Sequence, residues 1–285
     1  MRINLFTMAS MGLLPLWLGL FTLLPTLMVV AVSFLHRDEA GLIELVLTFD
    51  NYRRLLDPIY LKVFGHSLWL AGIATLLSLL VAYPFAYLLS RVRPLWRPAL
   101  LTLVVIPFWT NSLIRIYAVR SLLAAKGTLN TVLLALGLID EPVRLLYTHS
   151  AVTIGLVYVL LPFMILPLYS SFEKLDRRLI EAARDLGASR FATFWNIMLP
   201  LTTPGIVAGS LLVLLPALGM FYVTDVLGGA RDLLIGNFLK DQFLEARDWP
   251  FGAAASLLVI ALLFLLLSVY AFSRRWLTSG AESDV

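Results

Sequence analysis

The chain has 285 residues, of which 60% are hydrophobic and 14% are charged, and its formal net charge is +4. A soluble domain carries roughly 25% charged residues, so this composition indicates a protein that crosses a membrane several times. The sequence contains no cysteine, which excludes disulfides and thiolate metal sites, and its basic residues are too scattered to indicate nucleic-acid binding.

Six apolar runs are long enough to cross about 30 Å of hydrocarbon as helices, which takes roughly 20 residues each. These runs are residues 11–35, 66–90, 98–123, 150–172, 203–225 and 252–273. The first is too long for a signal peptide, and we expect it to remain as a transmembrane helix. The predicted fold class is therefore all-α: a single domain over residues 1–285, built as a polytopic bundle of six transmembrane helices.

Arginines in short segments indicate the orientation of the bundle. Three of them fall within residues 91–97, and Arg274 and Arg275 directly follow the last run. Lys and Arg are enriched in the short loops on the cytoplasmic side of a membrane. We therefore predict that both termini and the loop 173–202 are cytoplasmic.

A polar, charge-mixed stretch, EAARDLGASRFATFWNIMLP, occupies residues 181–200 between two apolar runs. Asp176 is predicted to cap a helix over residues 177–186, and Gly187 to end that helix in the left-handed conformation. Four apolar residues share one face at helical spacing, surrounded by charged side chains. They are Leu175, Leu179, Ala182 and Leu186. Such a helix is suited to docking against another protein.

A second short helix is predicted to follow. Ser189 is a good N-cap residue for it. We expect it to end near Leu199, because Pro200 disfavours a helical conformation in the residue before it.

This stretch also carries a sequence motif. The matching residues are Glu181, Ala182, Ala183, Gly187, Ile197, Leu199 and Pro200. In them the chain resembles the EAA loop of permease subunits of ATP-binding-cassette (ABC) importers. The resemblance implies a coupling helix that inserts into a cleft of a cytoplasmic ATPase. The residues implied in coupling are Glu181, Ala182, Ala183, Asp185, Leu186 and Gly187. The alternative is an ordinary solvated loop.

The likeness covers nearly all of the chain from about residue 36 onward, including PFWTNSLIRIY at Pro107–Tyr117 and RDWPFGAA at Arg247–Ala254. There the chain resembles the spermidine/putrescine permease subunits. The resemblance implies a type I ABC importer permease for polyamines in the bacterial inner membrane. It also implies a homologous second permease, two cytoplasmic ATPase subunits that bind the ATP, and an extracytoplasmic solute-binding protein. No cofactor is expected in this chain.

The third run contains candidate residues of the substrate pathway. Pro107 can open the local backbone ladder and leave Trp109 and Asn111 facing a cavity, where a Trp ring attracts an ammonium group. Tyr117 is a further candidate on this run. Arg115 must face protein or water. We favour a structural role for it, bonded to carbonyls or a carboxylate of a neighbouring helix, because an unpaired arginine would repel a cationic solute.

The fifth run ends in a second group of candidates. Asp225 is a carboxylate at the outer edge of the run, with Tyr222 one turn behind it and Phe221 beside it. An acid and aromatic rings are what a polyamine requires, because the charge pair offsets desolvation and ring faces hold the remaining cation. The alternative is a helix-end residue paired with Arg231 or Arg247.

Other function classes lack support in the sequence. It contains no HExxH, GxSxG or Walker lysine motif, so we expect neither an enzyme nor ATP hydrolysis in this chain. His36, His66 and His149 are not expected to cluster as metal ligands. The alternatives that remain are an importer permease for another small solute and, in a different class, an ion-coupled secondary transporter.

Overall fold

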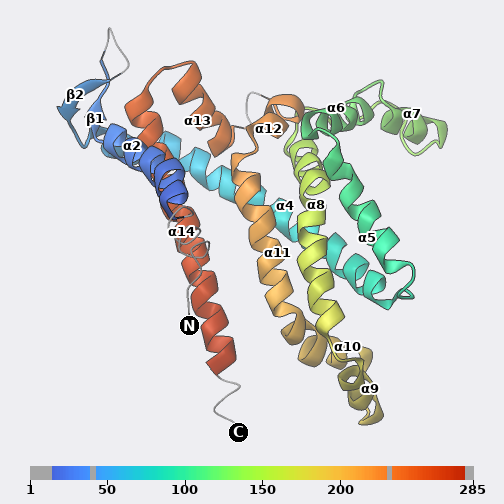
Figure 1. Ribbon diagram of the computed structural model, residues 1–285. Helices are drawn as coiled ribbons and strands as arrows, with labels where there is room; N and C mark the ends of the chain where they lie inside the picture. The colour runs from blue at the N-terminus through green and yellow to red at the C-terminus, as the bar shows by residue number, and fades with distance from the viewer. Residues whose placement is uncertain (1–14, 39–42, 230–232, 280–285) are drawn as a thin grey trace. The chain divides into compact units, whose positions relative to one another are not determined.

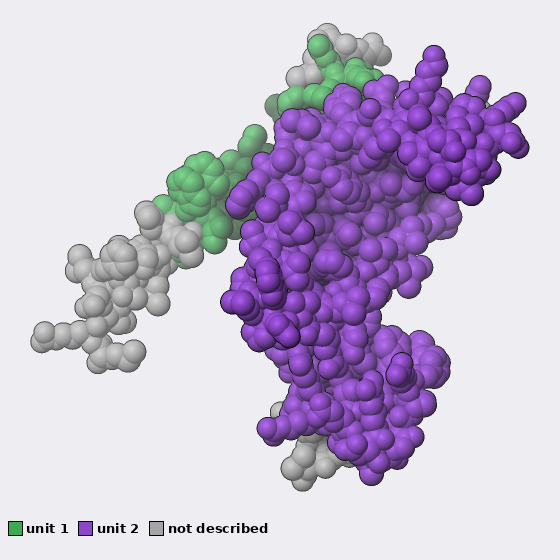
Figure 2. Space-filling view, turned by 90° about the vertical axis from the view of Figure 1, so that its right-hand side faces the viewer, with its two compact units in different colours: residues 1–62, 238–271 green, residues 63–237, 272–285 purple. Residues whose placement is uncertain are grey.

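The computed structural model describes residues 15–38, 43–229 and 233–279, with side chains to residue 268 in the last range (Figure 1). The chain divides into two compact units, coloured in Figure 2. Unit 1 comprises residues 1–62 and 238–271, and unit 2 comprises residues 63–237 and 272–285. Each is described by itself. The prediction of one domain over residues 1–285 stays a prediction.

The described part of the chain is a helical membrane bundle, as predicted. Five of its helices are long and apolar enough to cross a membrane, and a bent pair of helices makes up to six. The five are Pro15–Ser33, Pro58–Arg91, His149–Lys174, Arg190–Gly219 and Trp249–Ser268. The bent pair is Arg97–Trp109 with Ser112–Ala135.

Unit 1 combines helices with a small hairpin. Its elements are the π-helical turn η1 (Gly19–Leu23), α2 (Leu24–Ser33), β1 (Leu35–His36), β2 (Glu44–Leu47), α3 (Asp50–Leu55) and most of α14 (Trp249–Ser279). The two strands are antiparallel. Asn51 on α3 is 4% exposed and donates hydrogen bonds of 3.0 and 2.8 Å to the carbonyl oxygens of Ser33 and Leu35. These bonds fasten α3 to the end of α2.

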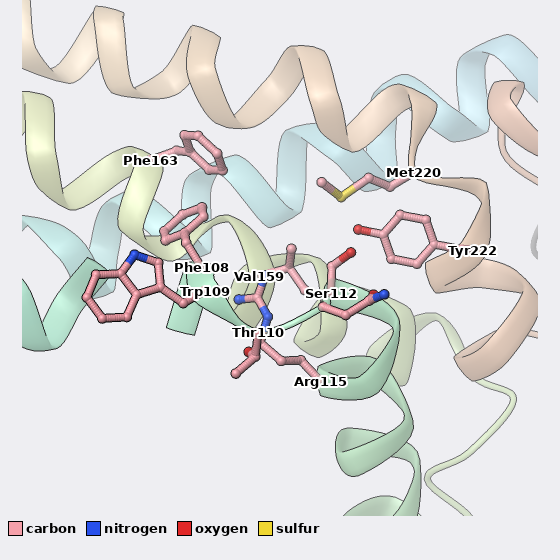
Figure 3. Close-up of a pocket in the computed structure, with 10 residues that line it drawn as sticks. Phe108, Trp109, Thr110, Ser112, Arg115, Val159, Phe163, Met220 and Tyr222 are labelled. Carbon is pink, nitrogen blue, oxygen red and sulfur yellow. The ribbon is translucent and has the colours of Figure 1, made fainter. Parts of the chain in front are cut away.

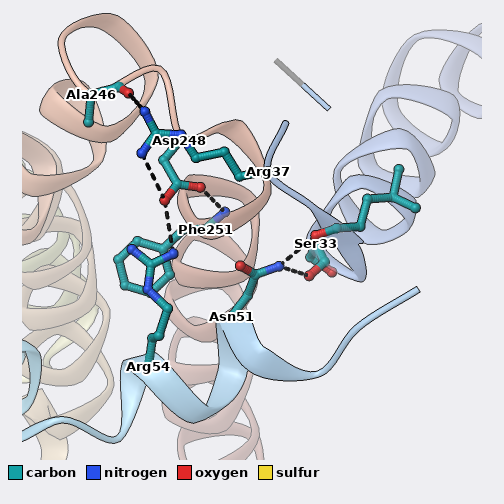
Figure 4. A network of polar contacts seen from close by, with 8 residues as sticks. Ser33, Arg37, Asn51, Arg54, Ala246, Asp248 and Phe251 are labelled. Atoms are coloured by element: carbon teal, nitrogen blue, oxygen red, sulfur yellow. Dashed lines mark hydrogen bonds and ion pairs between the residues drawn. The ribbon is translucent and has the colours of Figure 1, made fainter. Parts of the chain in front are cut away.

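The start of α14 is held by one buried carboxylate (Figure 4). Asp248 is 1% exposed, and its Oδ1 accepts a hydrogen bond from the backbone N–H of Phe251 as a helix cap. Its Oδ2 lies 2.9 Å from Nη1 of Arg54 and 3.8 Å from Nη1 of Arg37. The Arg54 guanidinium also lies over the Phe251 ring, 4.0 Å from its centroid. The charge of Asp248 is therefore compensated despite its burial.

The longer range of unit 2, residues 63–237, begins within α4 and ends within α13. Its helices are most of α4 (Pro58–Arg91), then α5 (Arg97–Val105), η2 (Ile106–Trp109), α6 (Ser112–Leu123), α7 (Thr128–Ala135), α8 (His149–Lys174), α9 (Arg177–Asp185), α10 (Arg190–Thr193), η3 (Phe194–Met198), α11 (Leu199–Gly219), α12 (Phe221–Leu227) and the start of α13 (Ile235–Leu244), whose residues from Phe238 on belong to unit 1. Helices α8 and α11 pack side by side, with α9 and α10 at one end of the pair and α6 and α12 at the other (Figure 1).

Close packing of α8 on α11 depends on glycine. A methyl group at Gly205 would lie 2.7 Å from the carbonyl oxygen of Pro167, and one at Gly209 would lie 2.7 Å from the sulfur of Met164. Small residues let two helix backbones approach closely within a membrane, where helix association depends on van der Waals packing.

The predicted span over residues 98–123 is broken into two helical segments. The chain leaves the helical conformation at Thr110 and Asn111, and the segments on either side are bent by 92°. Asn111 caps α6, with its Oδ1 accepting a 2.8 Å hydrogen bond from the N–H of Leu113. An N-cap residue has a non-helical backbone, so the amide that begins α6 also ends the preceding segment.

Two predicted helix ends also differ. The helix begun at Ser189 does not end near Leu199, because the π-helical turn η3 carries it into α11. The N–H of Leu199 bonds to the carbonyl of Phe194, one residue farther back than in an α-helix, and Pro200, which has no N–H to donate, directly follows this wider turn. The run 203–225 is interrupted after Gly219, so Asp225 lies on the separate helix α12.

Candidate coupling helix and substrate cavities

The predicted caps of the coupling segment are confirmed. Asp176 Oδ1 accepts a 3.0 Å hydrogen bond from the N–H of Arg178 at the start of α9. Gly187 has a φ of 85°, the left-handed conformation that ends a helix. Ser189 Oγ accepts a 3.2 Å hydrogen bond from the N–H of Ala192 at the start of α10. Two short helices thus form a hairpin at one end of unit 2.

The apolar face of α9 points away from its own chain. Leu186 is 89% exposed and Leu179 is 47% exposed, whereas Ile180 is 3% exposed and anchors the helix. Glu181, Ala182 and Asp185 are also exposed, and Ala183 is half-buried. The sequence analysis did not identify Ile180 as the buried residue of α9, because Ile180 lies beside the apolar face predicted from helical spacing. The exposed stripe is a surface available for docking.

A cavity of about 630 Å³ opens in unit 2 where the third run is broken (Figure 3). It is lined by Phe108, Trp109, Thr110, Asn111, Ser112, Arg115, Val159, Phe163, Met220 and Tyr222. The rings of Phe108 and Phe163 meet edge to face, with centroids 4.9 Å apart. The side chain of Trp109 is 81% exposed at this cavity. We refer to it as the aromatic cavity.

A second, smaller cavity of about 370 Å³ contains the predicted carboxylate. Its lining residues are Tyr147, Thr224, Asp225, Gly228, Gly229, Leu233 and Asn237. Asn237 is 3% exposed and donates a 2.6 Å hydrogen bond to Oδ1 of Asp225. Its own Oδ1 accepts hydrogen bonds from the Thr224 hydroxyl and the N–H of Leu234. We refer to this as the acidic cavity.

The predicted pathway residues are brought together only in part. Trp109, Asn111 and Tyr222 line the aromatic cavity, whereas Asp225 lines the acidic cavity. Tyr117 and Phe221 line neither of them. Residues one turn apart on the short helix α12 thus face different cavities, which the expectation of a single acid and aromatic cluster did not anticipate.

The alternative pairing of Asp225 with an arginine stays a prediction. Arg231 lies outside the described residues, and Arg247 belongs to unit 1 while Asp225 belongs to unit 2.

Arg115 does not have the acceptors that a structural role would supply. It is 8% exposed, and its guanidinium carbon lies 5.6 Å from the centroid of the Phe108 ring. Its Nε and Nη1 are buried and have no hydrogen-bond partner among the described residues. We expected Arg115 to bond carbonyls or a carboxylate of a neighbouring helix. The described residues provide no such acceptor for Nε and Nη1.

The rings of two of the three histidines lie close together. The rings of His66 on α4 and His149 on α8 have centroids 5.0 Å apart. Over the described residues, no group of three or more His, Cys, Asp or Glu side chains could hold a metal ion.

Sequence comparison identifies close relatives. The spermidine/putrescine transport system permease protein PotB of Escherichia coli K12 is 57% identical over 94% of this chain and 98% of the relative. The protein of the same name from Haemophilus influenzae is 53% identical over 99% and 98%. An inner membrane ABC transporter permease protein of Escherichia coli K12, YdcU, is 34% identical over 80% and 76%.

Structure comparison supports the fold. A subunit of a bacterial ABC transporter involved in the import of the acidic polysaccharide alginate superposes with a TM-score of 0.76, at 19% identity and 95% coverage of both chains. Residues 74–280 match the family described as the inner membrane component of binding-protein-dependent transport systems. The chain belongs to this family of multi-pass inner membrane permeases.

Proposed function

We propose that this chain is the transmembrane permease subunit of an ATP-driven ABC importer for polyamines, with spermidine and putrescine as the substrates. The observation that carries the proposal is the identity of 53–58% with spermidine/putrescine permeases over at least 94% of the chain. The two cavities of unit 2 give this substrate class a physical basis.

A polyamine carries ammonium groups separated by methylene segments, and it requires two kinds of contact. The Asp225 carboxylate in the acidic cavity offers a charge-assisted hydrogen bond to one ammonium group. The rings of Trp109 and Tyr222 in the aromatic cavity offer faces to another, each worth about 0.5–2 kcal/mol. Weak contacts of this kind hold a cation without trapping it.

The proposed assembly contains a homologous second permease, two ATPase subunits and an extracytoplasmic solute-binding protein. Both termini and the loop 173–202 are assigned to the cytoplasm, and ATP is bound by the ATPase subunits. Closure of the ATPases can shift the helical bundle from one conformation to the other only if the closed ATPases favour one of these two conformations. Helix α9 and the glycine that follows it transmit this preference from the ATPases to the bundle. The residues involved are Glu181, Ala182, Ala183, Asp185, Leu186 and Gly187.

Uptake by the reconstituted transporter tests this function. Proteoliposomes that hold the complete complex, with ATP on the ATPase side, are expected to accumulate radiolabelled spermidine and putrescine. Asp225→Asn is expected to raise the KM for uptake several-fold with the complex intact, and Glu141→Gln, which changes an exposed acid that lines neither cavity, is the control. No uptake by the wild-type complex with its cognate partners would refute the substrate.

A further inference from the structure

Arg115 is a buried cation in the wall of the aromatic cavity. It lies in the first turn of α6, directly after the break in the third run, and is 8% exposed. Its guanidinium is drawn among the cavity-lining side chains, between the rings of Phe108 and Trp109 on one side and Tyr222 on the other (Figure 3). Its positive charge therefore acts on any cation that enters this cavity.

The charge of Arg115 is not compensated within the described chain. No carboxylate lines the aromatic cavity. Nε and Nη1 are buried without a hydrogen-bond partner, and the Phe108 ring satisfies no N–H donor. By contrast, Arg54 has the Asp248 carboxylate, and Arg97 bonds the carbonyl oxygens of Val92 and Ser90. A buried cation without an acceptor is strongly unfavourable, so Arg115 requires one in the working protein.

The nearby polar side chains do not fill this need. Asn111 Oδ1 accepts the N–H of Leu113, and the Thr110 hydroxyl donates to the carbonyl of Pro107. Neither forms a hydrogen bond with the guanidinium. The planar fork of arginine is best matched by a carboxylate, which takes two of its N–H groups at once.

We propose that a carboxylate of the second permease subunit pairs with Arg115 and closes the wall of the aromatic cavity. This inference rests on the proposed function in one respect: a polyamine has no anionic group, so the substrate cannot supply the acceptor. Trp109, 81% exposed beside Arg115, leaves the cavity uncovered on this subunit, as expected where another chain completes it. The pair cancels a charge that would otherwise repel ammonium groups.

The carboxylate then has two competing partners. In the empty transporter it bonds Arg115, and an arriving ammonium group competes for the same oxygens. Arg115 thus acts as a positioning residue for the acceptor and sets the affinity of the cavity for cations, without touching the substrate.

Substitution in the complete complex tests the pairing. Arg115→Gln removes the charge, and Arg120→Gln is the matched control on the same helix, where the arginine bonds the Tyr147 hydroxyl at 3.1 Å. Arg115→Gln is expected to reduce both co-purification of the second permease and spermidine uptake by about tenfold, as when one partner of a buried charge pair is removed. Arg120→Gln is expected to retain both. Wild-type assembly and uptake of Arg115→Gln would overturn the proposal.

A second set of variants changes only the second permease, so that its single replacements do not depend on the folding of Arg115→Gln. Each Asp and Glu in the membrane segments of the second permease is replaced by Asn or Gln. One replacement is expected to reproduce the loss, and combining it with Arg115→Gln is expected to add little. If no replacement does so, the acceptor is not a carboxylate of the partner. The same conclusion follows if Arg115→Gln loses assembly and uptake only in anionic lipid, because a lipid headgroup is then the acceptor. Spermidine uptake by the wild-type complex in the same assay shows separately whether the proposed function holds.

Discussion

The carbonyl oxygen of Ser90, in the last turn of α4, accepts a 2.9 Å hydrogen bond from Nη2 of Arg177, in the first turn of α9. Nη2 of Arg97 donates to the same oxygen at 3.0 Å. The last carbonyls of a helix have no partner within it and carry its partial negative charge, so cations are favoured there. Helix α9, the proposed coupling helix, is thereby attached to the end of a transmembrane helix.

Arg177→Met is expected to loosen this attachment. One partly buried charge-assisted bond is worth about 1–2 kcal/mol, so the fold should persist while α9 transmits ATPase closure to α4 less firmly. We expect transport per ATP hydrolysed to fall several-fold in proteoliposomes. Arg178→Met is the matched control. The side chain of Arg178 is exposed, and only the backbone N–H of this residue takes part in the cap of α9. Equal coupling in the two variants would contradict the role of Ser90.

Leu186→Glu tests the docking surface of α9. The side chain is 89% exposed, so a charge there should leave the free energy of unfolding nearly unchanged. A carboxylate desolvated in an apolar contact is unfavourable, and we expect co-purification of the ATPase to fall at least tenfold. Leu45→Glu, on β2 and 88% exposed, is the control that should retain the ATPase. Full ATPase retention by Leu186→Glu would place the docking surface elsewhere.

Local sequence signals predicted the coupling hairpin well. Asp176, Gly187 and Ser189 are residues whose own chemistry starts or stops a helix, and each acts where its type indicates. Hydropathy likewise located the membrane helices, because the requirement for about 20 apolar residues is also local.

The same rules failed where the chain departs from regular helices inside apolar runs. The break at Asn111 and the continuation past Pro200 do not alter hydropathy, so a window average passes over both. The division of Tyr222 and Asp225 between two cavities depends on the interruption after Gly219 and on Asn237, twelve residues beyond Asp225. Such contacts between separate elements are not encoded in the spacing of neighbouring residues.

Gly205→Ala is expected to destabilise the pairing of α8 and α11. The added methyl would collide with Oγ of Ser171 and lie 2.7 Å from the carbonyl oxygen of Pro167, and the backbone atom cannot rotate away. Overpacking of this kind costs about 1–3 kcal/mol, seen as a lower Tm in detergent. Gly72→Ala on α4 is the control: its methyl meets nothing within 4 Å, and alanine favours the helix, so its Tm should not fall.

Asn237→Leu is expected both to lower the stability of the protein and to weaken substrate binding at the acidic cavity. The amide donates a 2.6 Å hydrogen bond to the Asp225 carboxylate, and its loss removes this bond from the acid and leaves the N–H of Leu234 without its acceptor. The buried group left unpaired costs about 1–3 kcal/mol of stability. Misplacement of the acid should also raise the KM for spermidine uptake in the variant that still folds.

The control for this variant is Asn51→Leu in unit 1. Asn51 is 4% exposed, compared with 3% for Asn237, and it also donates two hydrogen bonds, but neither reaches a cavity residue. Its replacement should lower Tm by a similar amount and leave the KM of the folded complex unchanged. Thermal unfolding and uptake kinetics measured on both variants separate the two effects. If both raise KM equally, the bond from Asn237 to Asp225 contributes only to stability, and the acidic cavity loses its support as part of the pathway.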